Sequence, residues 1–392
     1  MKREFVLYFF LSIFVTGCSS DKQSHKDLPC LDVGKNYPEK EINLTDMADV
    51  TYLHLSTEND DFLYRGGINH VTQNIIVVID RSSESVLFFS KDGNPKSRFN
   101  RKGQGSEEYV RVYSVMYDET ADDVYITPYF GDCIKVYSSS GEYKRKLPLP
   151  QNFEVQTVFF DDQSILVYDN SKMWQNITKK NTGDKTAFTE PIDSTFFLIS
   201  KTDGKVLEYI NLPGNNIDLS VGNTARTYYG QIGYARVGKC PDGLLLYNPE
   251  TDTVFLFSKD KSITPYIHKK PLLSDMDPMI VMDICKDVGS FQFMSVIPYL
   301  ADGGTSPPRY YMRDKKTGEI FRQKIILPDY EGKDFYIGPG LLSNEKGYYF
   351  ELDLYELKEA YRENRLSGKL KELVSTLNEN EDNNVFVLID FK

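Results

Sequence analysis

The sequence predicts an all-β fold built from a repeated unit of four short strands. Aromatic residues are abundant, with 27 Tyr and 24 Phe against one Trp, and many stand in short runs with β-branched residues. These residue types favour the pleated, half-buried surface of a strand. Turn sequences recur near positions 92, 140, 203, 260 and 317, a period of about 50 to 60 residues that is typical of a propeller blade. With a last unit at 335–352, the pattern predicts a six-bladed β-propeller of four-stranded antiparallel blades over residues 41–392.

The first unit, from Asn74 to Asn100, displays this pattern most clearly. Two strand-like runs, Ile75 to Asp80 and Ser85 to Ser90, precede the turn sequence Lys91-Asp92-Gly93-Asn94 and a third strand. Asp-Gly suits a two-residue hairpin in which both central residues have positive φ. The unit is therefore predicted to be an antiparallel meander.

A ring of blades must join its two ends, because one blade cannot bury both of its faces. We expect the final run, Val385 to Asp390, to pair with a strand near Ile42 or Tyr52. Such pairing of the two chain ends prevents the ring from opening.

A helical insertion is predicted at about residues 354–380. Its apolar residues lie at the spacing i, i+3, i+4, i+7 of one helix face, as Leu370, Leu373, Val374 and Leu377. Gly368 is expected to break the insertion into two helices, which pack on the rim of the ring. The alternative is a helix that docks a partner protein.

The N-terminus predicts export. Residues 1–17 have a basic start and an apolar run from Phe5 to Val15, too short to span a membrane and typical of a signal peptide. The sequence Val15-Thr16-Gly17-Cys18 resembles the lipobox of bacterial lipoproteins. This resemblance implies a lipid on Cys18, a polar tether over residues 18–40 and anchoring in the bacterial cell envelope, at the outer membrane. An ordinary secretory signal is the alternative.

Four further cysteines are Cys30, Cys133, Cys240 and Cys285. An exported protein can form disulfides. Their spacing fits no metal-binding pattern, however, and buried free thiols are the preferred interpretation over a disulfide framework.

Two segments resemble the six-bladed β-propeller lipoproteins of Bacteroidetes, which are distantly similar to NHL-repeat propellers. Gly103-Gln104-Gly105-Ser106-Glu107-Glu108-Tyr109 resembles their G-x-G-P-G-E-Y/F segment, and the ending from Asn384 to Lys392 resembles their N-P-V-L-V-I closing strand. The sequence departs from the pattern at Ser106, Glu107 and Asn384. The resemblance implies an architecture and an envelope location, and it assigns no chemistry.

The first of these segments is interpreted as a structural connection between blades. Gly103 and Gly105 are expected to form a left-handed or tight turn, and Glu108 to accept backbone N–H bonds beside Tyr109. A ligand site at this segment is the alternative.

No catalytic constellation, metal site or cofactor motif is recognised in the sequence. The histidines His25, His54, His70 and His268 are scattered, without the spacing of zinc ligands or a catalytic triad. Acidic pairs such as Asp161-Asp162 stand at predicted turns, where aspartate commonly stabilises the turn itself. The alternatives are an acid/base pair of a glycosidase and calcium ligands. The net charge of −11 disfavours nucleic acid, whose binding depends on Lys and Arg.

Two long loops are the candidate ligand sites, one between Asp169 and Asp193 and the other from Gly214 to Gln231. The stretch between Asp169 and Asp193 is polar and holds the only Trp, and a loop of this length is commonly functional or disordered. An aromatic ring with hydrogen-bonding neighbours is typical of carbohydrate sites, the alternative being a Trp that packs the loop against the rim. The candidate binding residues of the two loops are Trp174, Gln175, Asn176, Lys179, Arg226, Tyr228 and Tyr229.

The predicted function is a non-enzymatic binding or scaffold module that engages a glycan, a peptide or an envelope protein on one rim. The alternative is an NHL-like lyase or hydrolase with a metal or carboxylate site in the central channel. Convergence of acidic and His side chains from several blades on the axis would favour the enzyme. A third possibility is a structural partner of an outer-membrane transporter.

Overall fold

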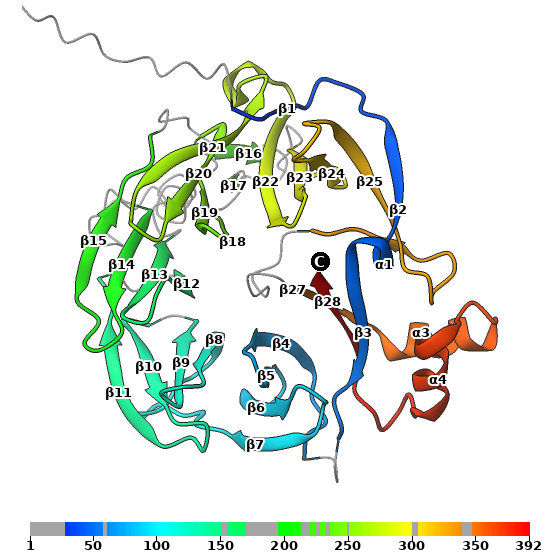
Figure 1. The fold of residues 1–392 in the computed structure, drawn as a ribbon. Coiled ribbons are helices and arrows are strands. Elements are labelled where there is room, and N and C mark those ends of the chain that lie inside the picture. The colour runs from blue at the N-terminus through cyan, green and yellow to red at the C-terminus, as the bar shows by residue number, and fades with distance from the viewer. Residues whose placement is uncertain are drawn as a thin grey trace, which may run out of the picture.

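The computed structural model describes residues 28–57, 61–129, 131–150, 155–169, 195–213, 220–223, 228–231, 236–248, 251–299, 305–338 and 347–392. These residues form six sheets that stand around a central axis (Figure 1) and one separate hairpin. The predicted six-bladed propeller is therefore confirmed.

The first three blades are four-stranded, and each runs from an inner to an outer strand. Their strands are β4 (Gly66–Val71), β5 (Ile75–Asp80), β6 (Ser85–Ser90) and β7 (Pro95–Phe99); β8 (Val112–Asp118), β9 (Asp123–Pro128), β10 (Cys133–Tyr137) and β11 (Tyr143–Pro148); and β12 (Val155–Phe159), β13 (Ser164–Asp169), β14 (Phe196–Ser200) and β15 (Val206–Ile210).

The other three blades depart from four strands. The fourth blade gains one extra outer strand and the fifth gains two, while the described part of the sixth has three strands. The 3₁₀ helix η2 (Leu273–Asp275) precedes the fifth blade. The strands of the three blades are β18 (Arg236–Cys240), β19 (Gly243–Tyr247), β20 (Thr253–Ser258) and β21 (Ile263–Lys270); β22 (Met279–Val288), β23 (Phe291–Tyr299), β24 (Arg309–Asp314) and β25 (Ile320–Ile326), with β26 (Asp334–Phe335) beside β25; and β27 (Gly347–Leu352), β28 (Val385–Phe391) and β3 (Ala48–His54).

The predicted turns join the third and fourth strands of the first five blades. Each holds one left-handed residue, and these residues are Gly93, Gly141, Gly204, Lys261 and Gly318. In the first blade the N–H of Gly93 donates to the carbonyl of Ser90, and the register shifts between Phe88 and Phe89. Asp92 is not among the described residues with positive φ. The predicted two-residue hairpin is thus corrected to a longer turn with one left-handed residue and a bulge.

Neighbouring blades share apolar cores. Phe88 of the first blade contacts Tyr117 of the second with ring centroids 5.3 Å apart, and both belong to one cluster with Val77 and Val115. Burial of a side chain as large as Phe contributes roughly 2 kcal/mol. Each blade therefore depends on its neighbour for much of its stability.

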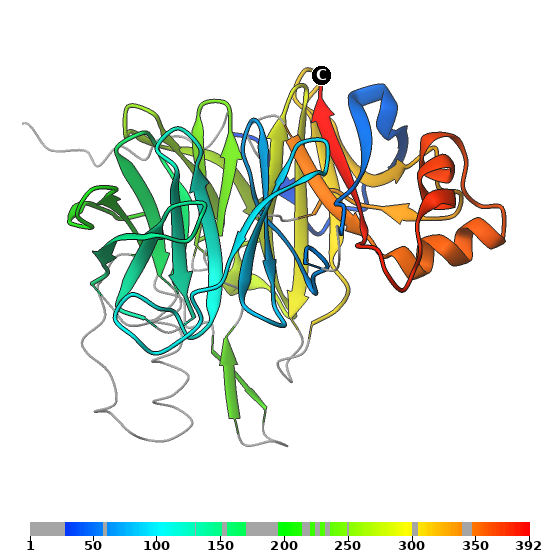
Figure 2. The ribbon, with the colours of Figure 1, turned by 90° about the horizontal axis from the view of Figure 1, so that it is seen from below.

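The ring has two faces that differ in their connections. The turn face carries the links from first to second and from third to fourth strands, such as 72–74 and 91–94. The loop face carries the links from second to third strands and those between blades. The hairpin of β16 (Ser220–Asn223) and β17 (Tyr228–Gln231) projects from the loop face, at the end of the ring opposite the C-terminus (Figure 2).

The N-terminal segment runs along the outside of the ring before it joins a blade. Strand β1 (Cys30–Asp32) pairs in parallel with β21, and β2 (Glu39–Asn43) pairs in parallel with β25. Helix α1 (Leu44–Met47) then leads into β3. Residues 28–40, predicted as part of a tether, therefore pack on the propeller, and the prediction is corrected for them. Covering the outer edges of two blades leaves fewer unpaired strand edges.

The ring closes through the two ends of the chain. Strand β28 pairs antiparallel with β3, from Val385 opposite His54 to Phe391 opposite Ala48, and β27 flanks it on the other side. The predicted closure near Tyr52 is confirmed. Ile42, the other candidate, lies in β2 and pairs with the fifth blade instead.

The predicted helical insertion lies between β27 and β28, outside the sixth blade (Figure 1). It consists of α3 (Leu354–Arg362) and α4 (Gly368–Thr376). Leu357 and Val374 are fully buried in the same cluster as Val385 of the closing strand. The helices are interrupted at residues 363–367, and Gly368 begins α4 rather than forming the break.

The described cysteines are free thiols. Cys133 and Cys240 are buried, and Cys30 is partly exposed. Burial raises the pKa of the Cys240 thiol to about 11. The side chain of Cys285 lies outside the described part of the structure.

The predicted signal peptide and Cys18 lie outside the described residues. In the part of the chain that the structure describes, no helix is both long and apolar enough to cross a membrane.

Asn383 joins the closing strand to the N-terminal chain. Its side chain is 3% exposed and donates to the carbonyls of Leu55 (2.9 Å) and Phe62 (3.0 Å). Its carbonyl oxygen accepts from the N–H of Tyr64 at 3.2 Å. One side chain therefore satisfies three backbone groups of the segment that links β3 to β4.

Asn383→Ala should lower the free energy of unfolding by about 3 kcal/mol, because it leaves buried backbone groups without partners. Asn384→Ala is the matched control. Asn384 is only partly buried and bonds to Leu354 and Glu351, so water can replace it and about 1 kcal/mol is expected. Urea unfolding of both variants measures the difference. Equal losses would contradict the role of Asn383 in closure.

Candidate functional site

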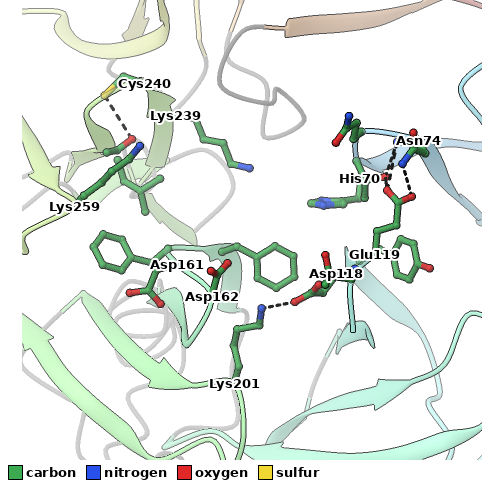
Figure 3. Close-up of a pocket in the computed structure, with 18 residues that line it drawn as sticks. His70, Asn74, Asp118, Glu119, Asp161, Asp162, Lys201, Lys239, Cys240 and Lys259 are labelled. Atoms are coloured by element: carbon green, nitrogen blue, oxygen red, sulfur yellow. Dashed lines mark hydrogen bonds and ion pairs between the residues drawn. The ribbon is translucent and has the colours of Figure 1, made fainter. Parts of the chain in front are cut away.

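A cavity of about 640 Å³ opens at the turn face of the ring. The turns that follow β4, β8, β12 and β18 line it, so four blades contribute side chains. Aromatic groups also reach it, from Tyr117, Phe159 and Phe160. The charged and titratable side chains that line it are His70, Asp118, Glu119, Asp161, Asp162, Lys201, Lys239 and Lys259 (Figure 3).

A smaller cavity of about 420 Å³ adjoins the first one. His70, Phe159 and Lys239 line both cavities. The smaller cavity also reaches Arg81 and Tyr113, which lie nearer the loop face. The two cavities thus meet at the level of these three shared side chains.

An ion pair between the second and third blades forms part of the wall. Lys201 Nζ lies 2.5 Å from Asp118 Oδ2 and 4.6 Å from the centroid of the Phe159 ring. Oδ1 of Asp118 accepts from the N–H groups of Thr120 and Ala121. Burial raises the pKa of Asp118, but the bonds from Lys201 and the backbone outweigh it and hold this pKa below the ordinary value. Asp118 is therefore ionised and fixed in place.

A second contact links the first and second blades. The Glu119 carboxylate accepts from the hydroxyl of Thr72 at 2.6 Å and from the side-chain amide of Asn74 at 2.8 Å. Burial opposes ionisation of Glu119, yet these bonds lower its pKa. Asp161 is held within its own turn, where it accepts from Ser164 and Gln163. These carboxylates serve as fixed acceptors.

His70 and Lys239 point toward one another across the cavity (Figure 3). The His70 ring contacts the Phe159 ring edge-on, with centroids 5.8 Å apart and an interplanar angle of 90°. Burial is the main cause that lowers the pKa of His70 to about 3, and the charge of Lys239 adds to it while Asp118 opposes it. His70 is therefore neutral at neutral pH.

Acidic and His side chains from three blades do converge near the axis, as the predicted enzyme alternative requires. The described carboxylates Asp118, Glu119 and Asp161 are bonded and have lowered pKa values, which suits acceptors better than proton donors. Among the described residues, no three His, Cys, Asp or Glu side chains are grouped as ligands for one metal ion.

The described lining of this cavity includes none of the sequence-predicted binding residues. Trp174, Gln175, Asn176, Lys179 and Arg226 lie outside the described residues. The backbone of Tyr228 and Tyr229 is in β17, on the hairpin that projects from the loop face. The larger cavity lies on the opposite face.

The Gly103–Tyr109 segment connects the first and second blades. Tyr109 is 1% exposed and donates from its hydroxyl to the carbonyl of Glu84. Glu108 accepts from the N–H of Gly105 at 2.9 Å. Gly103 and Gly105 are not among the described residues with positive φ, so the left-handed alternative is corrected. The N–H of Glu108 donates to the carbonyl of Gly105 at 3.0 Å, which agrees with the tight turn predicted as the other alternative. A Cβ on Gly103 would lie 1.9 Å from Glu108 Oε2, and Gly103 is needed for this close approach.

The sequence identifies His70, Asp161 and Asp162 of the cavity wall as individual residues but does not place them in one site. It does not single out Asp118, Lys201 or Lys239. One signal was available, because His70 and Lys239 are each the penultimate residue of an inner strand. Aligning the copies on their left-handed turns places the two residues within one position of each other.

The comparisons with known proteins agree with this fold. A family model described as "6-bladed beta-propeller" matches residues 19–203. A Bacteroides fragilis protein described as exported has a TM-score of 0.63 and 16% identity, covering 93% of this chain and 99% of that chain. A duf4221 family member from Bacteroides vulgatus has a TM-score of 0.45 and 12% identity, covering 88% and 97%. No curated protein matches the chain. The predicted resemblance to six-bladed β-propellers is confirmed.

Substitution of Gly103 should act through Glu108. In Gly103→Ala the new Cβ displaces the carboxylate from the N–H of Gly105, at a cost of about 1 kcal/mol. Glu108→Ala should cost about the same. Because one bond is lost in both, the double variant should cost little more than either single variant. Denaturant unfolding measures all three, and additive losses would contradict this arrangement.

Lys201→Met should lower the free energy of unfolding by about 2 kcal/mol at pH 7, because it leaves the ionised Asp118 without its cation in a partly buried wall. Because the pKa of Asp118 is lowered in the folded protein, its ionisation stabilises the fold at pH values above the ordinary pKa of an aspartate. This stabilisation is lost as pH falls through the folded-state pKa. The difference in free energy of unfolding between the variant and the native protein should therefore become smaller below pH 4. Denaturation at several pH values, with the exposed Lys259→Met as control, measures it. A gap independent of pH would contradict the role of the ion pair.

Proposed function

We propose that this chain is a non-enzymatic lipoprotein of the bacterial cell envelope that binds a carbohydrate in the larger cavity at the turn face. The observation that carries the proposal is the composition of the cavity wall. Four blades bring hydrogen-bonding side chains and aromatic rings around one volume of about 640 Å³, within the size range of small-molecule sites.

A sugar needs both donors and acceptors, because each hydroxyl group can donate and accept a hydrogen bond. The wall supplies acceptors in Glu119 and Asp162 and donors in Lys259, while Gln73 and Asn74 offer both. The rings of Phe159 and Phe160 supply apolar surface for the C–H faces of a sugar. An apolar ligand would leave these polar groups unpaired.

The bonding of the cavity side chains favours binding over catalysis. A general acid at neutral pH needs a raised pKa, whereas the pKa values of Asp118, Glu119 and Asp161 are lowered. The polar links between blades also hold the wall in place before a ligand arrives. A preformed wall reduces the entropic cost of binding.

The N-terminal sequence supports the envelope location. The lipobox-like sequence ending at Cys18 follows an apolar run of signal-peptide length, and a lipid on Cys18 would anchor the chain at the outer membrane. The Bacteroides fragilis protein with the same fold is described as exported. Mass spectrometry of the protein from membranes, with Cys18→Ala as control, tests the lipid.

Thermal denaturation of residues 19–392 with a panel of oligosaccharides tests the binding function. A ligand at about 100 times its Kd adds about 2.7 kcal/mol of stability, which raises the Tm. We expect at least one oligosaccharide to raise the Tm. This increase should be smaller in a Gln73→Ala, Asp162→Ala double variant, since both side chains are exposed at the cavity.

Trp174→Ala, in the loop that the sequence predicts as a binding site, is the comparison variant, and it should leave the stabilisation by the sugar unchanged. A hit lost only in Trp174→Ala would place the sugar at the predicted loop and overturn the cavity as the site. A stabilising divalent metal ion in place of a sugar would favour the enzyme alternative. A panel without any hit would contradict carbohydrate binding.

A further inference from the structure

We infer that the junction between the two cavities, where His70 and Lys239 face one another, is an anion subsite that takes an acidic group of the carbohydrate ligand. The inference rests on the proposed function, because it specifies the class of sugar. An acidic group here means a carboxylate, as in a uronic acid, or a sulfate.

The position of the two side chains is the first argument. His70 is the penultimate residue of β4 in the first blade, and Lys239 is the penultimate residue of β18 in the fourth. Both line the larger and the smaller cavity, and they point toward one another across the space between them (Figure 3). A group that passes from the larger cavity toward the smaller one therefore meets both nitrogen-bearing side chains.

The charge distribution is the second argument. The charged side chains that line the smaller cavity are Arg81 and Lys239, and the described lining of that cavity includes no carboxylate. In the larger cavity Asp118 is paired with Lys201, and Glu119 is bonded to Thr72 and Asn74. Among the described lining residues, the larger cavity therefore carries charges of both signs, whereas the smaller one carries positive charge.

The pKa of His70 reflects this positive charge. The effect of the Lys239 charge on its pKa exceeds the opposing effect of Asp118. Lys201, the other cation near Phe159, forms its ion pair with Asp118. An anion between His70 and Lys239 would be attracted by the charge of Lys239, and the burial of His70 at this junction would strengthen the attraction.

Anion binding should be coupled to protonation of His70. The pKa of His70 is about 3 in the free protein, and a bound anion moves it toward its ordinary value of about 6.5. The bound state then takes up a proton, so affinity increases as pH falls through the bound-state pKa. A neutral sugar does not produce this coupling.

The experiment compares galactose and galacturonate oligosaccharides of equal length by isothermal titration calorimetry, with inorganic sulfate as a third probe. We expect galacturonate to bind at least 10-fold more tightly than galactose at pH 7.5. Lys239→Gln should reduce that preference about 10-fold, and Lys239→Arg should keep most of it. Lys96→Gln, an equal change of charge on the outer strand β7, should keep it in full.

The coupling to His70 is measured separately by an NMR pH titration of its imidazole in the native protein. Galacturonate or sulfate should raise the pKa of His70, and galacturonate affinity should rise from pH 7.5 to pH 5. His70→Asn should remove this pH dependence. The titration keeps the inference testable if a Lys239 variant does not fold.

The outcomes separate this inference from the proposed function. The subsite would be overturned if both oligosaccharides bound equally. It would also be overturned if Lys96→Gln reduced the preference for galacturonate over galactose as much as Lys239→Gln does. Either result would leave carbohydrate binding intact. A sulfate-induced rise in the pKa of His70 without binding of either sugar would support the subsite and contradict the carbohydrate function. No change of His70 with any anion would overturn the subsite.

Discussion

The pairing of β28 with β3 is the constraint on which the rest of the structure depends. A ring of radial sheets has open edges at its first and last blades unless the two ends of the chain meet. Here the sixth blade is assembled from Ala48–His54 and from the C-terminal strands β27 and β28. Asn383 then binds the chain that leaves β3. Closure thus fixes the first blade against the last.

The N-terminal segment extends this closure around the outside. Because β1 and β2 lie on the fourth and fifth blades before β3 enters the sixth, three successive blades are joined by one stretch of chain. Helices α3 and α4 add their apolar residues to the core beneath β28. The sixth blade is therefore stabilised from both sides.

The cavities depend on the closed ring. His70 and Lys239 come from the first and fourth blades, so their separation is set by the number and tilt of the blades between them. Polar contacts at the turn face, Lys201 with Asp118 and Asn74 with Glu119, hold neighbouring blades in register. The same contacts lower the pKa values of both carboxylates and fix the charges of the cavity wall.

The sequence alone determined the strands, the recurring turns, the closing strand and the helical insertion, because each depends on periodicity and turn residues within a few positions of the chain. Only the tertiary structure decided the site. Residues far apart in sequence come together near the axis through ring geometry, which no local pattern encodes. The sequence therefore shows His70 only as a scattered histidine and does not single out Lys239. The Trp174 loop, in contrast, is predicted as a binding site from its composition. Packing likewise decided the role of Gly103, whose missing Cβ makes room for Glu108.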